Sequence, residues 1–314
     1  MVKYSDVLEL YEYFQPVYDI TNERKEYWKQ FIPTTPFLDT LKTFLTSIET
    51  KEPKNKKSIW LQGKYGVGKS HATGVILHLL WDPLENILDF IEKIKDAQLR
   101  EKIKAFRKHN RVFPVIIKGS SGINDGKSFS LLIEKSVKDA LEKETLDISV
   151  NTEFEKYINH IKNSPHIDWN NFIETKEELK ALVYDKKGLI EKLSEKDIEV
   201  LKVLEESLDY AIPTHNIEDW LIEVLTELRN RKIATALAIY WDEFTPILEL
   251  RKNSADILSI LQNIAEKSFN NNLFLFIVSH RHPLQASTQE DLEKLLGRFH
   301  YKNYSRVIKL IAIL

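Results

Sequence analysis

The chain has 314 residues, of which 43% are hydrophobic, enough to bury a sizeable core in one large domain or two ordinary ones. Its 45 Lys and Arg nearly balance its 47 Asp and Glu, and the net charge of -2 excludes any overall attraction to nucleic acid or to a membrane surface. The chain has no cysteine, no signal-peptide pattern at its start and no apolar run as long as a membrane span, which excludes disulfides and thiolate metal sites and predicts a cytoplasmic protein without a membrane partner.

The first part of the chain alternates helical and extended patterns. Residues 1–50 predict an N-terminal helical segment that two prolines interrupt. A polar linker over residues 51–57 leads to an apolar run at 58–61, which predicts a strand, and helical spacing follows over residues 70–80. We assign residues 51–125 to the first part of an α/β core.

The turn between that strand and that helix fits the P-loop pattern G-x-x-x-x-G-K-[ST]. It consists of Gly63, Lys64, Tyr65, Gly66, Val67, Gly68, Lys69 and Ser70, and we add the next residue, His71, to the predicted cofactor-binding set. Glycines let backbone amides point at phosphate oxygens, Lys69 would neutralise the terminal phosphates, and the Ser70 hydroxyl would bind Mg²⁺. The motif therefore predicts a nucleoside triphosphate with Mg²⁺ as ligand, and an accidental glycine-rich turn is the alternative.

The middle of the chain is dominated by helical patterns. Residues 84–109 predict two charged amphipathic helices, and the apolar run at 112–118 predicts a strand in which Pro114 favours an edge position. Residues 126–231 predict helices almost throughout, over a stretch longer than a crossover between neighbouring strands needs. We therefore expect a mainly helical insertion here.

The last part of the chain, residues 232–314, completes the predicted core. Apolar runs at 233–241, 273–279 and 307–314 predict three more strands, with a helix over 255–269 between the first two. Near-continuous apolar strands that alternate with helices are typical of a parallel sheet covered on both faces. The expected fold class is α/β, with a three-layer core of about five mainly parallel strands.

Two acidic residues, Asp242 and Glu243, directly follow the apolar run at 233–241. Ligands of open α/β sheets bind beyond the carboxyl ends of the strands, so both acids can face the P-loop. Asp242 would hold Mg²⁺, and Glu243 would orient an attacking water or take its proton as the catalytic base. The structural alternative is an acidic cap on the helix that follows.

Three further residues are candidates for catalysis. Ser279 is the first candidate and His280 the second for contact with the γ-phosphate or the attacking water, and the alternative is that both begin a solvated loop. Arg298 precedes the last predicted strand and would stabilise transition-state charge in a neighbouring subunit. Most arginines at helix ends are instead solvated or interact with the helix dipole.

The segments GKYGVGKS, AIYWDEF, FIVSHR and GRF, in this order, resemble the motifs of AAA+ and related P-loop ATPases with an additional catalytic glutamate. The resemblance spans residues 35–125 and 230–314, and it implies the strand order 5-1-4-3-2, ATP as the nucleotide and an arginine that acts in trans. The start of the P-loop helix also resembles that of large bacterial and archaeal ATPases of phage-defence systems such as the BREX type. In the family a helical lid follows the fifth strand, whereas we expect this chain to stop within that strand; either it is a fragment of a longer protein, or the lid is missing or replaced.

Three functions fit these observations. The first is an ATPase that drives conformational change in a larger assembly of other subunits or of copies of itself, with phage defence as one setting. The second is a nucleotide-dependent switch or scaffold with little turnover. The third is a DNA translocase, suggested by basic stretches that usually are solvated surfaces and that the net charge does not support. These stretches contain Lys54, Lys56, Lys57, Lys102, Lys104, Arg107, Lys108 and Arg111.

Overall fold

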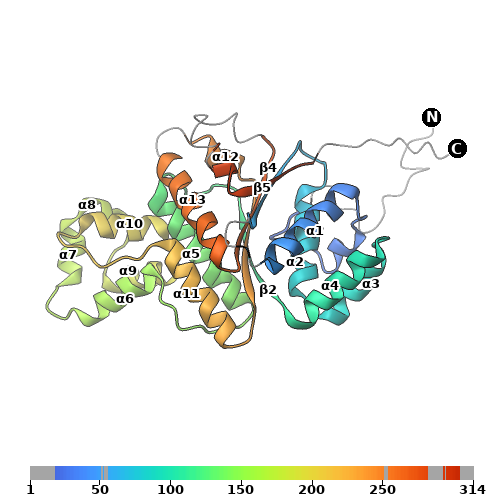
Figure 1. Cartoon of the computed structure of the whole chain (residues 1–314). Coiled ribbons are helices and arrows are strands. Elements are labelled where there is room, and N and C mark those ends of the chain that lie inside the picture. Colours follow the sequence, from blue (N-terminus) through green and yellow to red (C-terminus); the bar gives the residue numbers. More distant parts are fainter. Residues whose placement is uncertain are drawn as a thin grey trace, which may run out of the picture.

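The computed structural model describes residues 18–50, 52, 56–250, 254–281, 293 and 295–304. Its centre is one sheet of five strands in the order β2-β3-β4-β1-β5, and all neighbouring pairs are parallel (Figure 1). Counted from the other edge, this is the order 5-1-4-3-2, so the predicted fold class and strand order are confirmed. The strands are β1 (Ser58–Gln62), β2 (Val112–Lys118), β3 (Ala236–Asp242), β4 (Leu273–Ser279) and β5 (Phe299–Asn303).

The two edge strands differ in how well the sequence indicated them. β2 lies at one edge, where a proline such as Pro114, which has no backbone N–H to donate, is tolerated. The other edge is β5, which pairs with β1 from Ser58 opposite Phe299 to Gln62 opposite Asn303. The strand predicted at 307–314 lies outside the described residues. β5 escaped prediction because its residues after Phe299 are only partly buried or exposed, so it has no apolar run.

Alternating side chains of the strands enter two separate cores. In β3, Ile239 and Trp241 belong to the core on one face of the sheet, whereas Ala238 and Tyr240 belong to the core on the other. Successive side chains of a strand point to opposite faces, so a strand buried on both sides needs an apolar residue at every position. This requirement explains the continuous apolar runs of β3 and β4, which are buried along their whole length.

Helices cover both faces of the sheet and complete three layers (Figure 1). On one face lie α1 (Thr35–Glu49), α2 (Lys69–Trp81), α3 (Leu84–Glu92) and α4 (Ala97–His109), with the short 3₁₀ helix η2 (Tyr27–Gln30) against α2. On the other face lie α5 (Gly126–Lys143), α11 (Ile217–Asn230) and α13 (Ser254–Asn270), with the short helix α12 (Thr245–Leu248) directly after β3.

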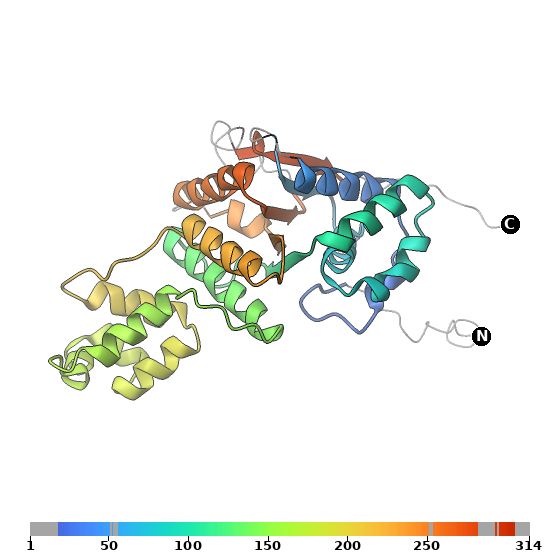
Figure 2. The same ribbon diagram turned by 60° about the horizontal axis from the view of Figure 1, so that its bottom comes forward.

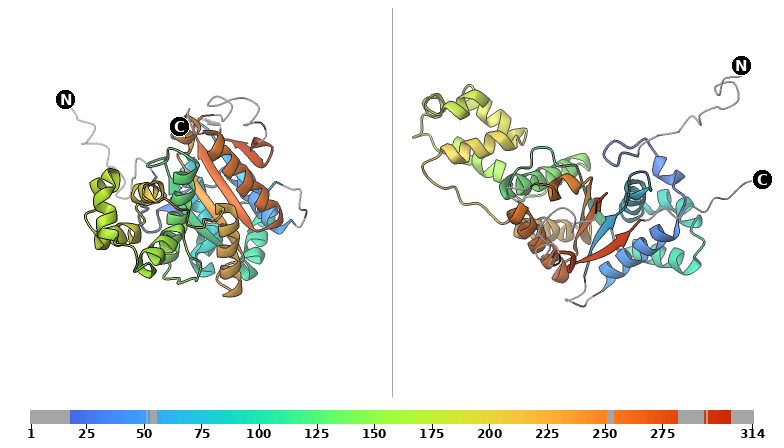
Figure 3. Two further views of the ribbon diagram at one scale, coloured as in Figure 1. Left: turned by 90° about the vertical axis from the view of Figure 1, so that its left-hand side faces the viewer. Right: turned by 90° about the horizontal axis from the view of Figure 1, so that it is seen from above.

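Five short helices form a separate lobe beyond α5 (Figures 2 and 3). They are α6 (Glu153–Asn163), α7 (Trp169–Thr175), α8 (Glu177–Leu182), α9 (Lys186–Ser194) and α10 (Ile198–Ser207). The lobe has its own core, which includes Phe154, Trp169 and Leu201. The predicted range 126–231 therefore contains both this lobe and two helices, α5 and α11, that cover the sheet. In the described part of the chain, no helix combines the length and the apolar character that crossing a membrane requires.

Candidate active site

The P-loop connects the carboxyl end of β1 to the start of α2. Its glycines are required by the backbone, because Gly66 and Gly68 have φ angles of +74° and +85°, in the left-handed region that favours glycine. At Gly63 the reason is a close approach, since a Cβ there would lie 2.4 Å from the carbonyl oxygen of Tyr304. A loop of this conformation turns the chain sharply from the buried strand into the helix, as the motif predicted.

Lys69 is the first residue of α2, and its ammonium group folds back onto the loop. Its Nζ donates hydrogen bonds to the carbonyl oxygens of Gly63 and Lys64, at 2.6 and 2.9 Å. Burial lowers the pKa of Lys69, while the charge of Asp242 acts in the opposite direction. Among the described residues no carboxylate lies within ion-pair distance of Lys69, so its direct contacts are the two backbone carbonyls, with Asp242 attracting it from farther away.

Asp242 reaches the same place from the other half of the chain. It is the last residue of β3, and only β4 separates β3 from β1 in the sheet. Burial raises the pKa of Asp242, whereas a hydrogen bond with the Ser70 side chain and the charge of Lys69 lower it. The structure thus brings Ser70, the predicted Mg²⁺ ligand of the P-loop, into contact with the predicted Mg²⁺ ligand of β3.

Glu243 has an unusual backbone and an exposed side chain. Its φ of 56° lies in the left-handed region, and its backbone N–H donates to the Asp242 carboxylate at 2.9 Å. This conformation costs a residue with a Cβ about 1 kcal/mol. The helix that follows is capped by Phe244 without any side-chain hydrogen bond, so neither acid acts as the helix cap that was the structural alternative.

Ser279 and His280, the first and second candidates for contact with the γ-phosphate, have different surroundings. The buried Ser279 hydroxyl accepts a hydrogen bond from the indole N–H of Trp60 and donates to the carbonyl of Arg281, both at 2.9 Å. The single hydroxyl proton of Ser279 is therefore already donated to a backbone carbonyl. The His280 ring stacks on Tyr65 of the P-loop with ring centres 4.5 Å apart, and burial and the neighbouring Arg281 lower its pKa. Ser279 is buried rather than the start of a solvated loop.

These groups surround one cavity of about 370 Å³ at the carboxyl end of the sheet. Among the predicted residues, Gly63, Lys64 and Val67 belong to the loop without lining the cavity; Gly63 and Lys64 instead supply the carbonyls that hold Lys69. The predicted residues that line it are Tyr65, Gly66, Gly68, Lys69, Ser70, His71, Asp242, Glu243, Ser279 and His280.

One wall of the cavity is aromatic, and two of its residues, Tyr18 and Tyr27, were not predicted. The ring of His71 stacks on Tyr18 at 4.4 Å and on Tyr27 at 5.4 Å between ring centres, and Phe31 packs edge-on against it at 5.0 Å. Tyr18 and Tyr27 lie in a segment without a motif. The signal that could have found this contact is Gly74 inside α2, because a Cβ there would lie 1.9 Å from the Tyr18 hydroxyl.

Arg298 does not join the site within one chain. It directly precedes β5, which runs parallel to β1, so it lies at the amino end of the sheet, about 15 Å along the strand from the level of the P-loop. Its guanidinium donates a hydrogen bond to Glu266 of α13 at 2.8 Å. A role in the site of a neighbouring subunit stays a prediction.

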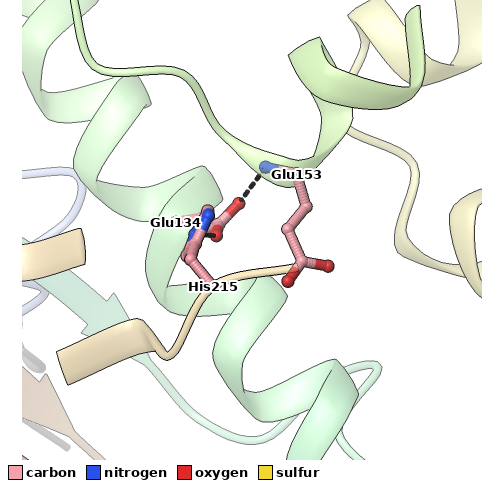
Figure 4. Close-up of side chains that lie close together, drawn as sticks. All are labelled: Glu134, Glu153 and His215. Carbon is pink, nitrogen blue, oxygen red and sulfur yellow. Dashed lines mark hydrogen bonds and ion pairs between the residues drawn. The ribbon is translucent and has the colours of Figure 1, made fainter. Parts of the chain in front are cut away.

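A second buried polar cluster lies where the lobe of α6–α10 leaves and rejoins the core (Figure 4). Potential ligand atoms of Glu134 on α5, Glu153 on α6 and His215 before α11 lie within 4.8 Å of one another. Glu134 accepts a hydrogen bond from the backbone N–H of Glu153 at 2.9 Å and pairs with His215. Lys127 pairs with Glu153, and the Lys156 Nζ lies 2.7 Å from His215. This cluster already contains the cations that balance its carboxylates.

Only the first of the two clusters combines a cavity with a buried cation that has no anionic partner among the described residues. The geometry therefore points to the P-loop edge of the sheet as the place where an anionic ligand would bind. No protein-family model matches this chain, and a search of curated proteins finds no match for it either.

Proposed function

We propose that this protein binds ATP with Mg²⁺ and hydrolyses it, and that it uses the cycle to change the conformation of a larger assembly, with phage defence as one setting. The observation that carries the proposal is the convergence of Lys69, Ser70, Asp242 and Glu243 on one cavity. The order of the sequence motifs, which resembles that of AAA+ and related P-loop ATPases, supports the same conclusion.

The polar groups of the site fit a triphosphate and its metal ion. Lys69 donates hydrogen bonds to two backbone carbonyl oxygens, and it can donate to phosphate oxygens instead. The phosphates would then lie at the N-terminal end of α2, where the helix dipole is positive. Ser70 and Asp242 would hold Mg²⁺, because hydroxyl and carboxylate oxygens are the ligands this ion prefers. The ion would supply positive charge that stabilises the phosphate oxygens and favours the ionised form of the buried Asp242.

Hydrolysis needs a base on the attacking side of the γ-phosphate. Glu243 lines the cavity with an exposed carboxylate and would take a proton from water as the water oxygen bonds to the γ-phosphorus and ADP leaves. Lys69 would stay with the phosphate oxygens and stabilise their charge. His280 is the better candidate for contact with the γ-phosphate, because the Ser279 proton is already donated to a backbone carbonyl.

The aromatic wall fits the other end of the nucleotide. Tyr18, Tyr27 and His71 line the same cavity as the P-loop and present flat rings on which a base can stack. Adenine is the base that the resemblance implies. Tyr18 and Tyr27 precede β1 whereas His71 lies on α2, so binding of the base would hold the segment that contains Tyr18 and Tyr27 against α2.

A chain of contacts leads from the site to the helical lobe. The backbone N–H of Gly119, just after β2, donates to the carbonyl of Asp242 at 2.9 Å. A few residues later, the same loop is bound by Lys202 of α10, which donates to Asn124 at 3.0 Å and pairs with Asp125. These contacts connect the position of Asp242 to that of the lobe, so the lobe is the part of the chain through which the nucleotide site would act on other subunits.

The proposal is tested by phosphate release and calorimetric ATP binding in the full chain and in Glu243→Gln. We expect both proteins to bind ATP·Mg²⁺ and the variant to lose about 100-fold or more in turnover, since a positioned base contributes that much. Glu249→Gln, which removes a carboxylate paired with Arg281 outside the cavity, is the matched control and should keep its turnover.

The other outcomes separate the alternatives. If the natural chain binds ATP but releases no phosphate, it is the nucleotide-dependent switch rather than the ATPase. If it binds no nucleoside triphosphate at all, the whole proposal fails.

A further inference from the structure

The basic stretch near residue 105 divides into two parts in the structure. Lys102 forms an ion pair with Glu49 at 3.0 Å, and Lys104 forms one with Glu92 at 2.8 Å. These two lysines belong to an exposed surface of mixed charge, which explains their presence without a ligand. The remaining cations of the stretch have different surroundings.

A second cavity, of about 650 Å³, lies at the amino end of the sheet. Three residues that line it, Arg111, Thr235 and Asn272, directly precede β2, β3 and β4. The cavity is thus about 20 Å from the P-loop edge, at the opposite end of seven-residue strands. Among the described residues that line it none is acidic, and five are Lys or Arg: Arg107, Lys108, Arg111, Arg229 and Lys232.

These five cations are not neutralised by neighbouring acids. Within residues 56–250, which contain the whole cavity lining except Asn272, none of the five forms an ion pair. Burial and the neighbouring Arg111 lower the pKa of Arg107 to about 10, and burial lowers the pKa of Arg229, yet both stay charged at neutral pH. Glu144 attracts Arg111, and Asp82 attracts both Arg107 and Arg111, but neither acid lies within ion-pair distance of them, and Asp82 already pairs with His78.

Helix ends account for part of this arrangement. Arg107 donates to the carbonyl oxygen of Asp82 at 2.6 Å, and Arg111 donates to that of Trp81 at 2.8 Å, so both cap the C-terminal end of α2. The helices α2, α4 and α11 all end here, and each contributes about half a negative charge. Together they offset fewer than two of the five positive charges.

The groups that remain able to bind a ligand come from both sides of the cavity. Arg229 uses its Nε for the carbonyl of Thr235, at 3.2 Å, which leaves its terminal nitrogens for an incoming acceptor. Lys108 is exposed at the end of α4, and Lys232 is exposed just after α11. Two segments far apart in the sequence thus supply cations to one hollow because β2 and β3 are neighbours in the sheet.

We propose that this cavity binds a phosphate group, as a second anion site independent of the P-loop. The planar guanidinium of Arg229 matches two phosphate oxygens at once, and a dianion compensates more of the excess charge than a carboxylate would. A free phosphorylated ligand and the backbone of a single-stranded nucleic acid share this chemistry. The sheet lies between the two sites, so one nucleotide does not occupy both.

The test uses the full chain with Lys69→Ala, which removes the phosphate contact of the P-loop. Inorganic pyrophosphate is titrated by calorimetry, and a labelled single-stranded oligonucleotide by fluorescence anisotropy. We expect binding at one site that weakens as salt is raised, and a loss of about tenfold or more when Lys108→Gln and Lys232→Gln are combined, because two charge contacts are removed. Both lysines are exposed, so this variant is expected to fold; Arg229→Gln is tested separately.

Arg231→Gln is the matched control, because Arg231 lies between Arg229 and Lys232 in sequence but pairs with Glu227, at 3.5 Å, and does not line the cavity. Its affinity should stay within about twofold of the parent. Pyrophosphate binding without oligonucleotide binding would assign the site to a free ligand, and binding of both, in competition, would assign it to a nucleic-acid backbone. The inference is overturned if neither probe binds, or if the control loses as much affinity as the cavity variants.

Discussion

The P-loop edge and the junction of the helical lobe both bury charged side chains, but they balance these charges differently. At the junction Glu134 is hydrogen-bonded to His215 and to the backbone N–H of Glu153, and Glu153 pairs with Lys127, so both buried carboxylates have partners within the protein. At the P-loop edge Lys69 has only backbone carbonyls, beside a buried carboxylate whose pKa is raised. Ligand-type residues that lie close together therefore do not by themselves indicate a ligand. A charge left without its counterpart does, because burying it costs free energy that a ligand can return.

The largest effect is expected from breaking the balanced cluster. Glu134→Leu would leave His215 and the backbone N–H of Glu153 without their acceptor, so the free energy of unfolding should fall by about 3 kcal/mol or more. Urea unfolding measures it. Glu191→Leu, which removes an exposed partner 3.6 Å from Lys187, should change stability by less than about 0.5 kcal/mol. Equal effects of the two variants would show that the junction is not a balanced network.

At the P-loop edge, loss of the buried charge should change stability little and ligand binding strongly. Lys69→Met removes a buried cation without an anionic partner, so the stability of the free protein should fall by no more than about 1 kcal/mol. Its nucleotide response should disappear: we expect ATP·Mg²⁺ to raise the melting temperature of the natural chain and not that of the variant. A variant that is as unstable as Glu134→Leu would contradict the comparison.

Within the site, substitutions can distinguish a structural role of Ser279 from a catalytic role of His280. Ser279→Ala leaves the buried indole N–H of Trp60 without an acceptor and should cost about 1–2 kcal/mol of stability. His280→Ala should leave stability almost unchanged and lower phosphate release by about tenfold through loss of a contact to the γ-phosphate. Thermal unfolding and steady-state phosphate release are measured for both variants. If Ser279→Ala lowers phosphate release and His280→Ala lowers stability, Ser279 is the residue that contacts the γ-phosphate.

The last comparison concerns a balance of charge that depends on a proton. His78 of α2 lies 2.7 Å from Glu23 and 2.8 Å from Asp82; burial lowers its pKa, but these acids outweigh burial and raise it to about 9. A raised histidine pKa contributes stability that is complete below about pH 6.5 and is lost as the pH rises through 9. We expect a loss of roughly 2 kcal/mol between pH 6.5 and 9.5 in urea unfolding. The loss should be absent in His78→Gln.

The features that could be predicted from the sequence are those determined by residues close together in the chain. The glycines of the P-loop follow from backbone angles, and Asp242 follows from its place at the end of a buried strand. The parts that stayed hidden depend on the packing of distant segments. The role of Ser279 is decided by Trp60 of another strand, and the wall of Tyr18 and Tyr27 is decided by how an N-terminal segment crosses α2.

The second cavity was partly hidden for the same reason: Arg107, Lys108 and Arg111 stand out as a basic stretch in the sequence, but Arg229 and Lys232 do not. Its cations come from the ends of α4 and α11, which the sequence separates by more than a hundred residues and the pairing of β2 with β3 brings together. Composition gave no hint of it, because the cations are offset by acids elsewhere in the chain. An edge strand such as β5 is also hard to predict, since a half-exposed strand needs few apolar residues.

The left-handed backbone of Glu243 has a consequence for any attempt to improve this protein. Glycine would relax that turn and gain about 1 kcal/mol, yet it would remove the group that is proposed to activate water. A library selected only for heat resistance would therefore become enriched in glycine at this position, and the enriched variants would be inactive. Screening for thermal tolerance and for turnover together is the way to keep variants that still work.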